Sequence, residues 1–219
     1  SFPTRRSSDL QIFIKRDDML GLTAGGNKTR KLEFLLADAL SKGTDTLVTC
    51  GAVQSNHCRL TLAAAVKEGL KCRLVLEERV PGSYNPQSSG NNFLFKLLGV
   101  EAVTVVPGGT IMLEAMEKVA AEVRAAGGKP YIIPGGGSNA IGATGYVNCA
   151  QELQQQLFAE GHTFDHIVVP SGSGGTHAGF LVGIVGNNLN IPVHGINVSR
   201  KTALQTDLIH SLCRLTAEH

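Results

Sequence analysis

A lysine at the start of an amphipathic segment is the first residue in this sequence whose position points to chemistry. Lys28 follows the glycine pair Gly25-Gly26, and apolar side chains recur after it at helical spacing. These apolar residues are Leu32, Leu35, Leu36, Ala39 and Leu40. Because Lys28 lies four residues before Leu32, both side chains are predicted on the same inward face, whereas Arg30 is about 200° away around the helix.

An inward-facing lysine would be chemically unusual. Burial disfavours an ammonium ion and favours the neutral amine, which is the form that condenses with a carbonyl group to give a Schiff base. The alternative is a lysine that reaches solvent from the helix end, although a positive charge there opposes the helix dipole. Asn27 is expected to cap this helix, and the two preceding glycines allow a close approach of other groups.

A second candidate is the segment Ser171–Thr176, Ser-Gly-Ser-Gly-Gly-Thr, which follows an apolar run and opens an apolar helix. Because glycines have no side chains, the successive backbone N–H groups of this segment can converge on an anion. Ser173 and Thr176 add hydroxyl groups. The segment therefore predicts a phosphate site. It lacks the Gly-Lys-Ser/Thr of a P-loop, and His177 occupies the third glycine position of the dinucleotide-binding fingerprint. The alternative is a glycine turn for tight strand–helix packing.

A third candidate is the segment 54–57, Gln-Ser-Asn-His, which joins another apolar run to another predicted helix. Ser55 can cap that helix, whose first N–H groups could hold a carboxylate. Ser55 and His57 could also form a nucleophile–base pair, but the Gly-x-Ser-x-Gly turn typical of such serines is absent. A structural or surface role for His57 is the alternative. The glycine-rich segment 135–139 also follows a strand, and a plain loop is one interpretation of it.

Strands and helices that alternate along the chain would position these segments. Predicted strands are Ile12–Lys15, Thr46–Cys50, Arg73–Leu76, Ala102–Val106, Tyr131–Ile133, His166–Val169 and Val193–Val198. Predicted helices span residues 27–42, 55–69, 89–98, 110–127, 140–159, 174–187 and 201–217. This alternation, with uniformly apolar strands, is typical of parallel α/β sheets that are covered on both faces. Ligands bind outside the carboxyl ends of such strands, where the glycine-rich segments begin.

The composition excludes several classes of protein. The 219 residues are 42% hydrophobic and include 26 glycines but no Trp. A net charge of +2 without blocks of like charge argues against nucleic-acid binding. The sequence contains no apolar run of ~18 residues, so it predicts no membrane-spanning helix. The five cysteines, widely spaced and without a Cys-x-x-Cys pair, predict free thiols and no metal site. Without an apolar leader at its start, the protein is expected to be cytoplasmic.

Five motifs in series connect the sequence to a known family. They are Lys15–Asp18, Gly25–Glu33, Gln54–His57, Gly136–Asn139 and Ser171–Thr176. In this order they resemble the D-cysteine desulfhydrase and 1-aminocyclopropane-1-carboxylate deaminase family. The resemblance implies a pyridoxal-phosphate enzyme of fold type II, the tryptophan synthase β-like α/β fold. That fold has two three-layer parallel-sheet domains with the cofactor between them.

The resemblance also implies roles for the residues of these motifs. Lys28 matches the lysine that binds pyridoxal 5'-phosphate covalently and moves protons at the substrate Cα. The phosphate loop corresponds to Ser171, Gly172, Ser173, Gly174, Gly175 and Thr176. Asn56 matches the asparagine beside the ring hydroxyl of the cofactor, and Asn27 is expected to contact the cofactor. Ser55 is expected to act near the substrate carboxylate and Cα, with Gln54, Asn56 and His57 as further substrate contacts.

The implied reaction is an α,β-elimination on a small amino acid. With the substrate bound to the cofactor, Lys28 would act as general base and a group at Cβ would leave. D-Cysteine would give pyruvate, sulfide and ammonia, and the motifs at 54–57 and 171–176 favour this branch of the family. L-Cysteate sulfo-lyase and 1-aminocyclopropane-1-carboxylate deaminase activities are alternatives. A non-catalytic ligand-binding α/β fragment is an alternative of another class.

The resemblance further predicts a domain organisation. Residues 1–30 and 141–219 would belong to a large cofactor-binding domain, and residues 31–140 to a smaller domain. Residues 1–10 look foreign to the family, and members are expected to continue beyond His219 with a tyrosine near the substrate and a partner for the pyridine nitrogen. The 219-residue chain alone is therefore expected to be weakly active or inactive. The full-length protein is expected to be a homodimer.

Overall fold

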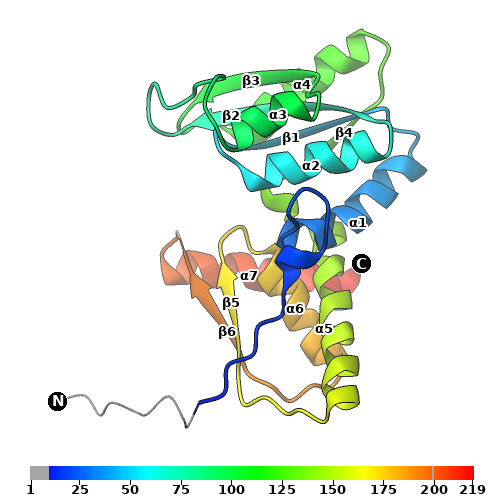
Figure 1. The fold of residues 1–219 in the computed structure, drawn as a ribbon, viewed down its shortest axis with the longest axis vertical. Helices are drawn as coiled ribbons and strands as arrows, with labels where there is room; N and C mark the ends of the chain where they lie inside the picture. The colour runs from blue at the N-terminus through cyan, green and yellow to red at the C-terminus, as the bar shows by residue number, and fades with distance from the viewer. Residues whose placement is uncertain (1–9, 199) are drawn as a thin grey trace, which may run out of the picture.

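The computed structural model describes residues 10–198 and 200–219, which form two parallel sheets and the helices around them (Figure 1). The strands are β1 (Thr46–Ala52), β2 (Lys71–Glu78), β3 (Ala102–Pro107), β4 (Pro130–Ile133), β5 (Ile167–Ser171) and β6 (Val193–Asn197). The helices are α1 (Asn27–Ser41), α2 (Asn56–Lys67), α3 (Asn91–Leu97), α4 (Met112–Ala125), α5 (Ala140–Glu160), α6 (Gly175–Gly186) and α7 (Thr202–Glu218). Short 3₁₀ helices are η1 (Asp17–Met19) and η2 (Gly135–Gly137). Within the described ranges, none of the helices is long and apolar enough to cross a membrane.

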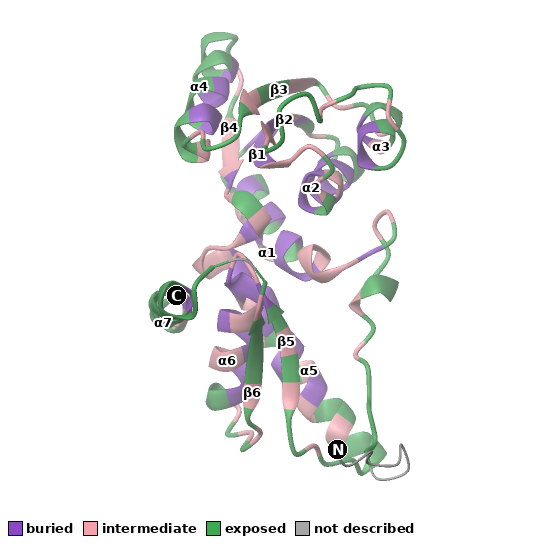
Figure 2. Cartoon of the chain, turned by 90° about the vertical axis from the view of Figure 1, so that its left-hand side faces the viewer, coloured by how far each residue is buried: buried purple, intermediate pink, exposed green. Residues whose placement is uncertain are grey.

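The first sheet has the strand order β3-β2-β1-β4, with every neighbouring pair parallel. Successive side chains of a strand point to opposite faces, so a strand with both faces buried sits between two layers of helices. Leu47 packs with α1, α2 and α3 on one face, whereas Val48 packs with α4 on the other, and both side chains are fully buried. Figure 2 shows α2 and α4 on opposite sides of this sheet. This sheet is therefore the middle of a three-layer arrangement.

The second sheet contains β5 and β6, which are parallel. Helices α5 and α6 cover one of its faces, where Ile167 and Val193 pack against Tyr146 and Phe180. Val168, on the opposite face, is 65% exposed. Among the residues that the structure describes, this sheet is covered on one side, which agrees with the expectation of an incomplete large domain. The domain boundaries at residues 30 and 140 stay a prediction.

The segment before α1 corrects one predicted strand. Residues 12–15 have no regular structure, and the side chains of Ile12 and Ile14 are 77% and 76% exposed. The strand prediction was wrong because an apolar run forms a strand only where another strand pairs with it. Lys15 instead binds Glu152 and Gln156 of α5 at 2.8 and 2.7 Å. The expectation that residues 1–10 are foreign falls almost entirely outside the described residues.

Helix α1 lies between the two sheets and buries more polar groups than its sequence predicts. Arg30 does point away from Lys28, yet it is buried and forms ion pairs with Asp17 at 2.8 Å and Glu152 at 2.7 Å. Leu40, placed by its spacing on the buried stripe, is 42% exposed because it lies in the last turn of the helix. The apolar stripe therefore ends at Ala39.

Some of the glycines serve helix packing rather than loops. A Cβ atom at Gly145 of α5 would lie 2.1 Å from the carbonyl oxygen of Arg30 in α1. A Cβ atom at Gly179 of α6 would lie 2.0 Å from the carbonyl oxygen of Ala143 in α5. Both distances are far below a van der Waals contact, so the helices cross this closely only because these residues lack a side chain.

Candidate functional site

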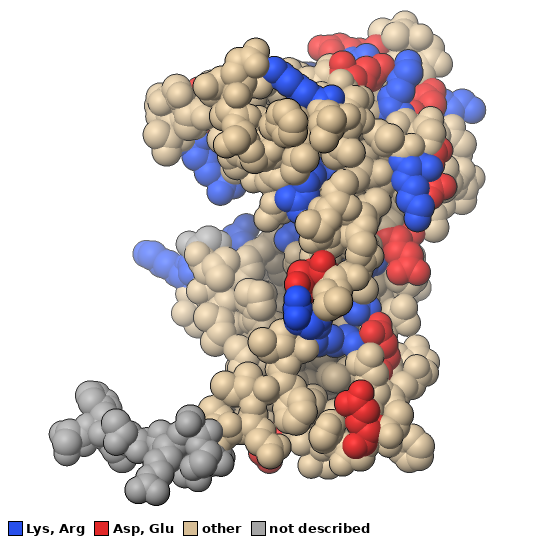
Figure 3. All heavy atoms as spheres, in the orientation of Figure 1, with Lys and Arg blue, Asp and Glu red and all other residues tan. Residues whose placement is uncertain are grey.

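The three motifs with predicted chemistry stand at helix starts near the junction of the two sheets. Asn27 and Lys28 open α1, Ser55 precedes α2, and the segment 171–176 leads from β5 into α6. Figure 3 shows the surface hollowed between the two halves of the molecule, with basic side chains along the edges of the hollow. The hydrogen bonds described below connect the first and the third of these motifs.

Lys28 is half-buried, and it is linked to the glycine-rich loop through its neighbour Asn27. Its Nζ donates to Asn27 Oδ1 at 3.0 Å, and Asn27 Nδ2 donates to Thr176 Oγ1 at 2.8 Å. The prediction that Asn27 caps α1 was wrong: Gly26 occupies the N-cap position, and the Asn27 side chain reaches across to α6. Burial lowers the pKa of Lys28, which favours the neutral amine that covalent chemistry requires.

A second lysine, which the sequence analysis did not select, lies beneath the same loop. Lys31 is only 1% exposed, and its Nζ donates to Gly136 O at 3.1 Å and to Ser138 Oγ at 3.2 Å. Ser138 in turn donates to Ser173 Oγ at 2.8 Å and accepts a hydrogen bond from Gly175 N at 3.2 Å. The loop after β4 therefore joins α1 to the start of α6. The sequence alone leaves the role of this loop open, with a plain connection as one interpretation.

The electrostatics of this region fit a phosphate group. Burial, together with the positive charge of Lys28, lowers the pKa of Lys31 from 10.5 to about 7. Neither lysine forms an ion pair with a carboxylate of the described residues. The amino end of α6 adds the partial positive charge of a helix dipole and N–H groups without helical partners. A dianion would compensate all of these, so the residues present fit the phosphate of pyridoxal phosphate.

Helix α7 holds the first two residues of the loop, Ser171 and Gly172, through Gln205. Ser171 is buried, and its Oγ contacts His177 Nδ1 at 3.0 Å and accepts a hydrogen bond from Gln205 Nε2 at 2.9 Å. Gln205 Nε2 also donates to Gly172 O at 3.0 Å. Gly174 has a φ of 96°, which a residue with a side chain rarely adopts. Helix α7 therefore fixes the base of the loop at Ser171 and Gly172, whereas Ser138 and Asn27 hold the part from Ser173 onward.

The turn before α2 has the conformation expected for a helix cap. Ser55 Oγ accepts a hydrogen bond from Cys58 N at 3.2 Å, which confirms Ser55 as the N-cap. Asn56, the first residue of α2, is exposed, and its Oδ1 accepts a hydrogen bond from Arg59 Nη1 at 2.8 Å. The side chain of Gln54 is directed away from the helix start, toward the segment 88–91.

His57 faces the interior. Its Nε2 lies 2.8 Å from Thr49 Oγ1, and that hydroxyl donates to Ile133 O at 2.8 Å. Because the threonine proton is used, Nε2 is the protonated ring nitrogen. Burial and the charges of Lys28 and Lys31 lower the pKa of His57 to about 3, so the ring is neutral. The ring is engaged with the first sheet and not with Ser55, and its assignment as a substrate contact stays a prediction.

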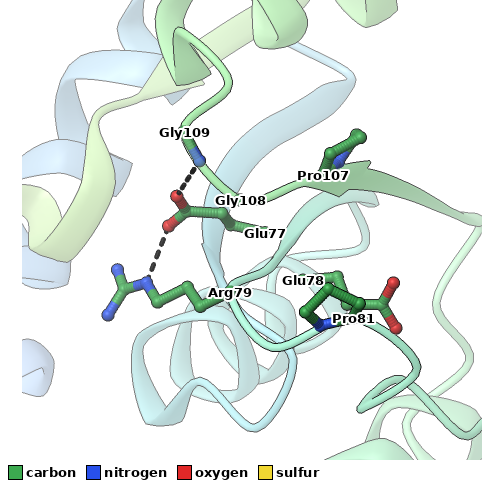
Figure 4. A pocket seen from close by; sticks show the side chains of 7 residues that line it. All are labelled: Glu77, Glu78, Arg79, Pro81, Pro107, Gly108 and Gly109. Carbon is green, nitrogen blue, oxygen red and sulfur yellow. Dashed lines mark hydrogen bonds and ion pairs between the residues drawn. The ribbon is translucent and has the colours of Figure 1, made fainter.

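A separate pocket of about 520 Å³ lies at the carboxyl ends of β2 and β3 (Figure 4). Its lining residues are Glu77, Glu78, Arg79, Pro81, Pro107, Gly108 and Gly109. Glu77 accepts hydrogen bonds from Arg79 Nε at 2.7 Å and from Gly109 N at 3.1 Å. None of the predicted site residues lines this pocket. The one basic side chain of this pocket, Arg79, is paired with Glu77 and is not available to an anionic ligand. The candidate site therefore remains the region at the start of α6.

Comparison with known proteins gives a consistent result. Residues 2–214 match the family described as pyridoxal-phosphate dependent enzyme. A D-cysteine desulfhydrase of Yersinia enterocolitica is 48% identical over 196 residues, which are 89% of this chain and 59% of that protein. A D-cysteine desulfhydrase of Klebsiella pneumoniae strain 342 is 46% identical over 209 residues, 94% of this chain and 63% of that protein.

Solved structures show the same relationship. The crystal structure of an ACC deaminase homologue superposes with a TM-score of 0.82 and 41% sequence identity, covering 93% of this chain and 60% of that one. A pyridoxal 5'-phosphate-dependent aspartate racemase shares the fold, with a TM-score of 0.59 at 20% identity, covering 86% of this chain and 52% of that one. The fold is therefore pyridoxal-phosphate fold type II. The chain spans about three fifths of the length of the curated relatives that it matches.

Proposed function

This chain belongs to the family of pyridoxal-phosphate dependent enzymes, and from that premise we propose that its protein is a carbon–sulfur lyase acting on D-cysteine. The overall reaction takes D-cysteine and water to pyruvate, sulfide and ammonia. The curated relatives with 46–48% identity are D-cysteine desulfhydrases, which supports this substrate. The observation that carries the proposal is the linkage of the half-buried Lys28 to the glycine-rich loop 171–176 through Asn27 and Thr176.

The chain provides a group for each part of the cofactor. The segment 171–176, with Lys31 beneath it, would hold the phosphate, and Lys28 would hold the aldehyde carbon. Asn56 would stand beside the ring hydroxyl. When bound, pyridoxal phosphate withdraws electrons from the Cα atom of an amino acid and so makes its Cα–H bond acidic.

The protein's own groups would carry out the remaining steps. The amine of Lys28, whose pKa is lowered by burial, takes the proton from Cα. Ser55 and the first N–H groups of α2 bind the substrate carboxylate, because a helix start favours an anion. Lys31, protonated when the phosphate compensates its charge, keeps the cofactor oriented. The thiolate leaves from Cβ as the electrons of the Cα–H bond form the new double bond.

An ACC deaminase activity is the second candidate, because the solved homologue at 41% identity bears that name. L-Cysteate is a third substrate to test. The homodimer, the cytoplasmic location and the absence of a nucleic-acid partner stay predictions, and light scattering tests the first of these.

Borohydride reduction tests the function. The chain is mixed with pyridoxal phosphate and reduced, and the modified peptide is identified by mass spectrometry. We expect a single label on Lys28 and none in Lys28→Ala, with Lys67→Ala, an exposed lysine of α2, as the control that keeps the label. A label that survives in Lys28→Ala refutes the assignment. Release of pyruvate from D-cysteine and L-cysteate, and of 2-oxobutanoate from 1-aminocyclopropane-1-carboxylate, then ranks the substrates, with the Yersinia relative as reference.

A further inference from the structure

The conformation of the turn before α2 depends on a residue of α3. Asn91, the first residue of α3, is polar but buried. Its backbone N–H donates to Gln54 Oε1 at 2.7 Å, and its Nδ2 donates to Gln54 O at 2.7 Å and to Asn56 Oδ1 at 2.9 Å. One residue of α3 thus holds two positions of the turn, Gln54 and Asn56, on either side of Ser55.

These contacts leave the Asn56 amide with one orientation. Arg59 Nη1 donates to the same Asn56 oxygen at 2.8 Å, and a guanidinium group can only donate. The contacted atom is therefore the carbonyl oxygen and not the amide nitrogen. With hydrogen bonds from both Arg59 and Asn91, this oxygen has no lone pair left. The Nδ2 group, with its two N–H donors, is the part of the Asn56 side chain that remains for a ligand.

Asn91 and Arg59 also hold each other. Asn91 Oδ1 accepts a hydrogen bond from Arg59 Nη1 at 2.8 Å, so the three side chains of Asn56, Arg59 and Asn91 form a closed triangle. The preceding Gly90 allows this close approach, because a Cβ atom there would lie 2.9 Å from Gln54 Oε1. The triangle uses both the donor and the acceptor of the Asn91 amide.

We propose that Asn91 is a positioning residue of the cofactor site, which holds Asn56 so that an N–H donor and not a carbonyl oxygen faces the ring hydroxyl of pyridoxal phosphate. The identity of this ligand rests on the proposed function, whereas the hydrogen-bond triangle belongs to the chain alone. A donor beside an ionised hydroxyl stabilises the negative charge and lowers the proton affinity of the bound cofactor. Asn91 therefore acts on the cofactor through Asn56.

The proton affinity of the bound cofactor is measured by titrating its visible absorbance with pH. Replacing Asn91 by Ala removes one of the two hydrogen bonds that orient the Asn56 amide, together with the acceptor that holds Arg59 in place. We expect the midpoint to rise by roughly half to one pH unit, the effect of one neutral hydrogen bond. Asn92→Ala is the matched control, because Asn92 is also buried in α3 but its Nδ2 donates to Asn85 O and Ser88 Oγ. Equal midpoints in the wild type and Asn91→Ala overturn the proposal, as does an equal shift in the control.

A double-mutant comparison shows whether Asn91 acts through Asn56. In an Asn56→Ala background, Asn91→Ala should cause no further shift of the midpoint, because the group that it positions is gone. Two independent, additive shifts contradict the proposal. Asn91→Asp replaces the alanine variant if that variant does not fold, since it keeps the volume and the contact with Arg59 but loses both donors. It is expected to shift the midpoint in the same direction.

Failure of the proposed function is recognised separately. If borohydride fails to label Lys28 of the wild type, the cofactor assignment fails. Hydrogen exchange of the Ser55 N–H in the cofactor-free chain then tests whether Asn91 stabilises the turn before α2. That N–H donates to Ala52 O at 3.0 Å, and Asn91→Ala should accelerate its exchange at least about tenfold, whereas Asn92→Ala should not. Unchanged exchange in Asn91→Ala shows that Asn91 does not hold the turn.

Discussion

The buried Lys31 predicts a change in stability that depends on pH in a defined direction. Its pKa in the folded chain is about 7, against 10.5 for the free side chain. Between these pH values the unfolded chain holds a proton that the folded chain has released, so the free energy of unfolding rises with pH. Below about pH 7 both states are protonated, and folding bears the full cost of burying the charge.

The size of this effect follows from the pKa difference. Lys31 is 1% exposed, so solvent does not screen its charge. At about 1.4 kcal/mol for each pKa unit, the lowered pKa corresponds to roughly 5 kcal/mol in the free energy of unfolding. Lys31→Met removes this cost together with two hydrogen bonds, to Gly136 O and Ser138 Oγ, worth about 1 kcal/mol each. The variant is therefore expected to be more stable than the wild type by roughly 3 kcal/mol at pH 6, and less stable by about 2 kcal/mol near pH 11.

Urea unfolding followed by circular dichroism at several pH values measures this difference. Lys67→Met, an exposed position of α2, is the control for removing a lysine. Inorganic phosphate should stabilise the wild type more than Lys31→Met, because the anion compensates the buried charge. A difference between Lys31→Met and wild type that stays constant from pH 6 to pH 11 refutes the reasoning.

Three further predictions follow from the packing. Gly145→Ala places a Cβ atom 2.1 Å from Arg30 O and should cost about 2 kcal/mol or more in urea unfolding, whereas Gly186→Ala, with nothing within 4 Å, should cost none. Arg30→Met removes the ion pairs with Asp17 and Glu152, which leaves Asp17 with Tyr146 and Glu152 with Lys15, and should cost roughly 2–4 kcal/mol, seen as a lower Tm; an unchanged Tm contradicts this. The pKa of His57 lies near 3, so stability should fall as the pH drops from 6.5 toward 3, and less so in His57→Gln; parallel acid profiles of the two contradict the assignment.

The short-range features of the fold could be predicted from the sequence. The alternation of apolar runs and amphipathic segments located the strands of both sheets, and the polar residue before α2 located the cap at Ser55. Spacing predicted Lys28 on the inward face of α1, where its side chain is half-buried. These features depend on hydrogen bonds and side-chain periodicity within one segment, so the local sequence contains the information that decides them.

The partners of the polar side chains depended on the tertiary structure. Asn27 reads locally as a cap, yet it binds Thr176, which is 149 residues away. Lys31 follows Lys28 by less than one turn of α1, but its burial depends on the loop after β4 and the start of α6 closing over it. The run 12–15 reads as a strand, and within residues 10–198 and 200–219 no strand pairs with it.

The sequence by itself therefore determined which segments fold into helices and strands and which residue types stand at their ends. The tertiary structure decided which of those ends meet. The physical reason is that a helix or strand satisfies its backbone within a short range, whereas a buried ammonium or amide takes its hydrogen-bond partner from whatever long-range packing brings beside it. Asn91 shows this most plainly, because its contacts with Gln54 and Asn56 span 35–37 residues of the chain.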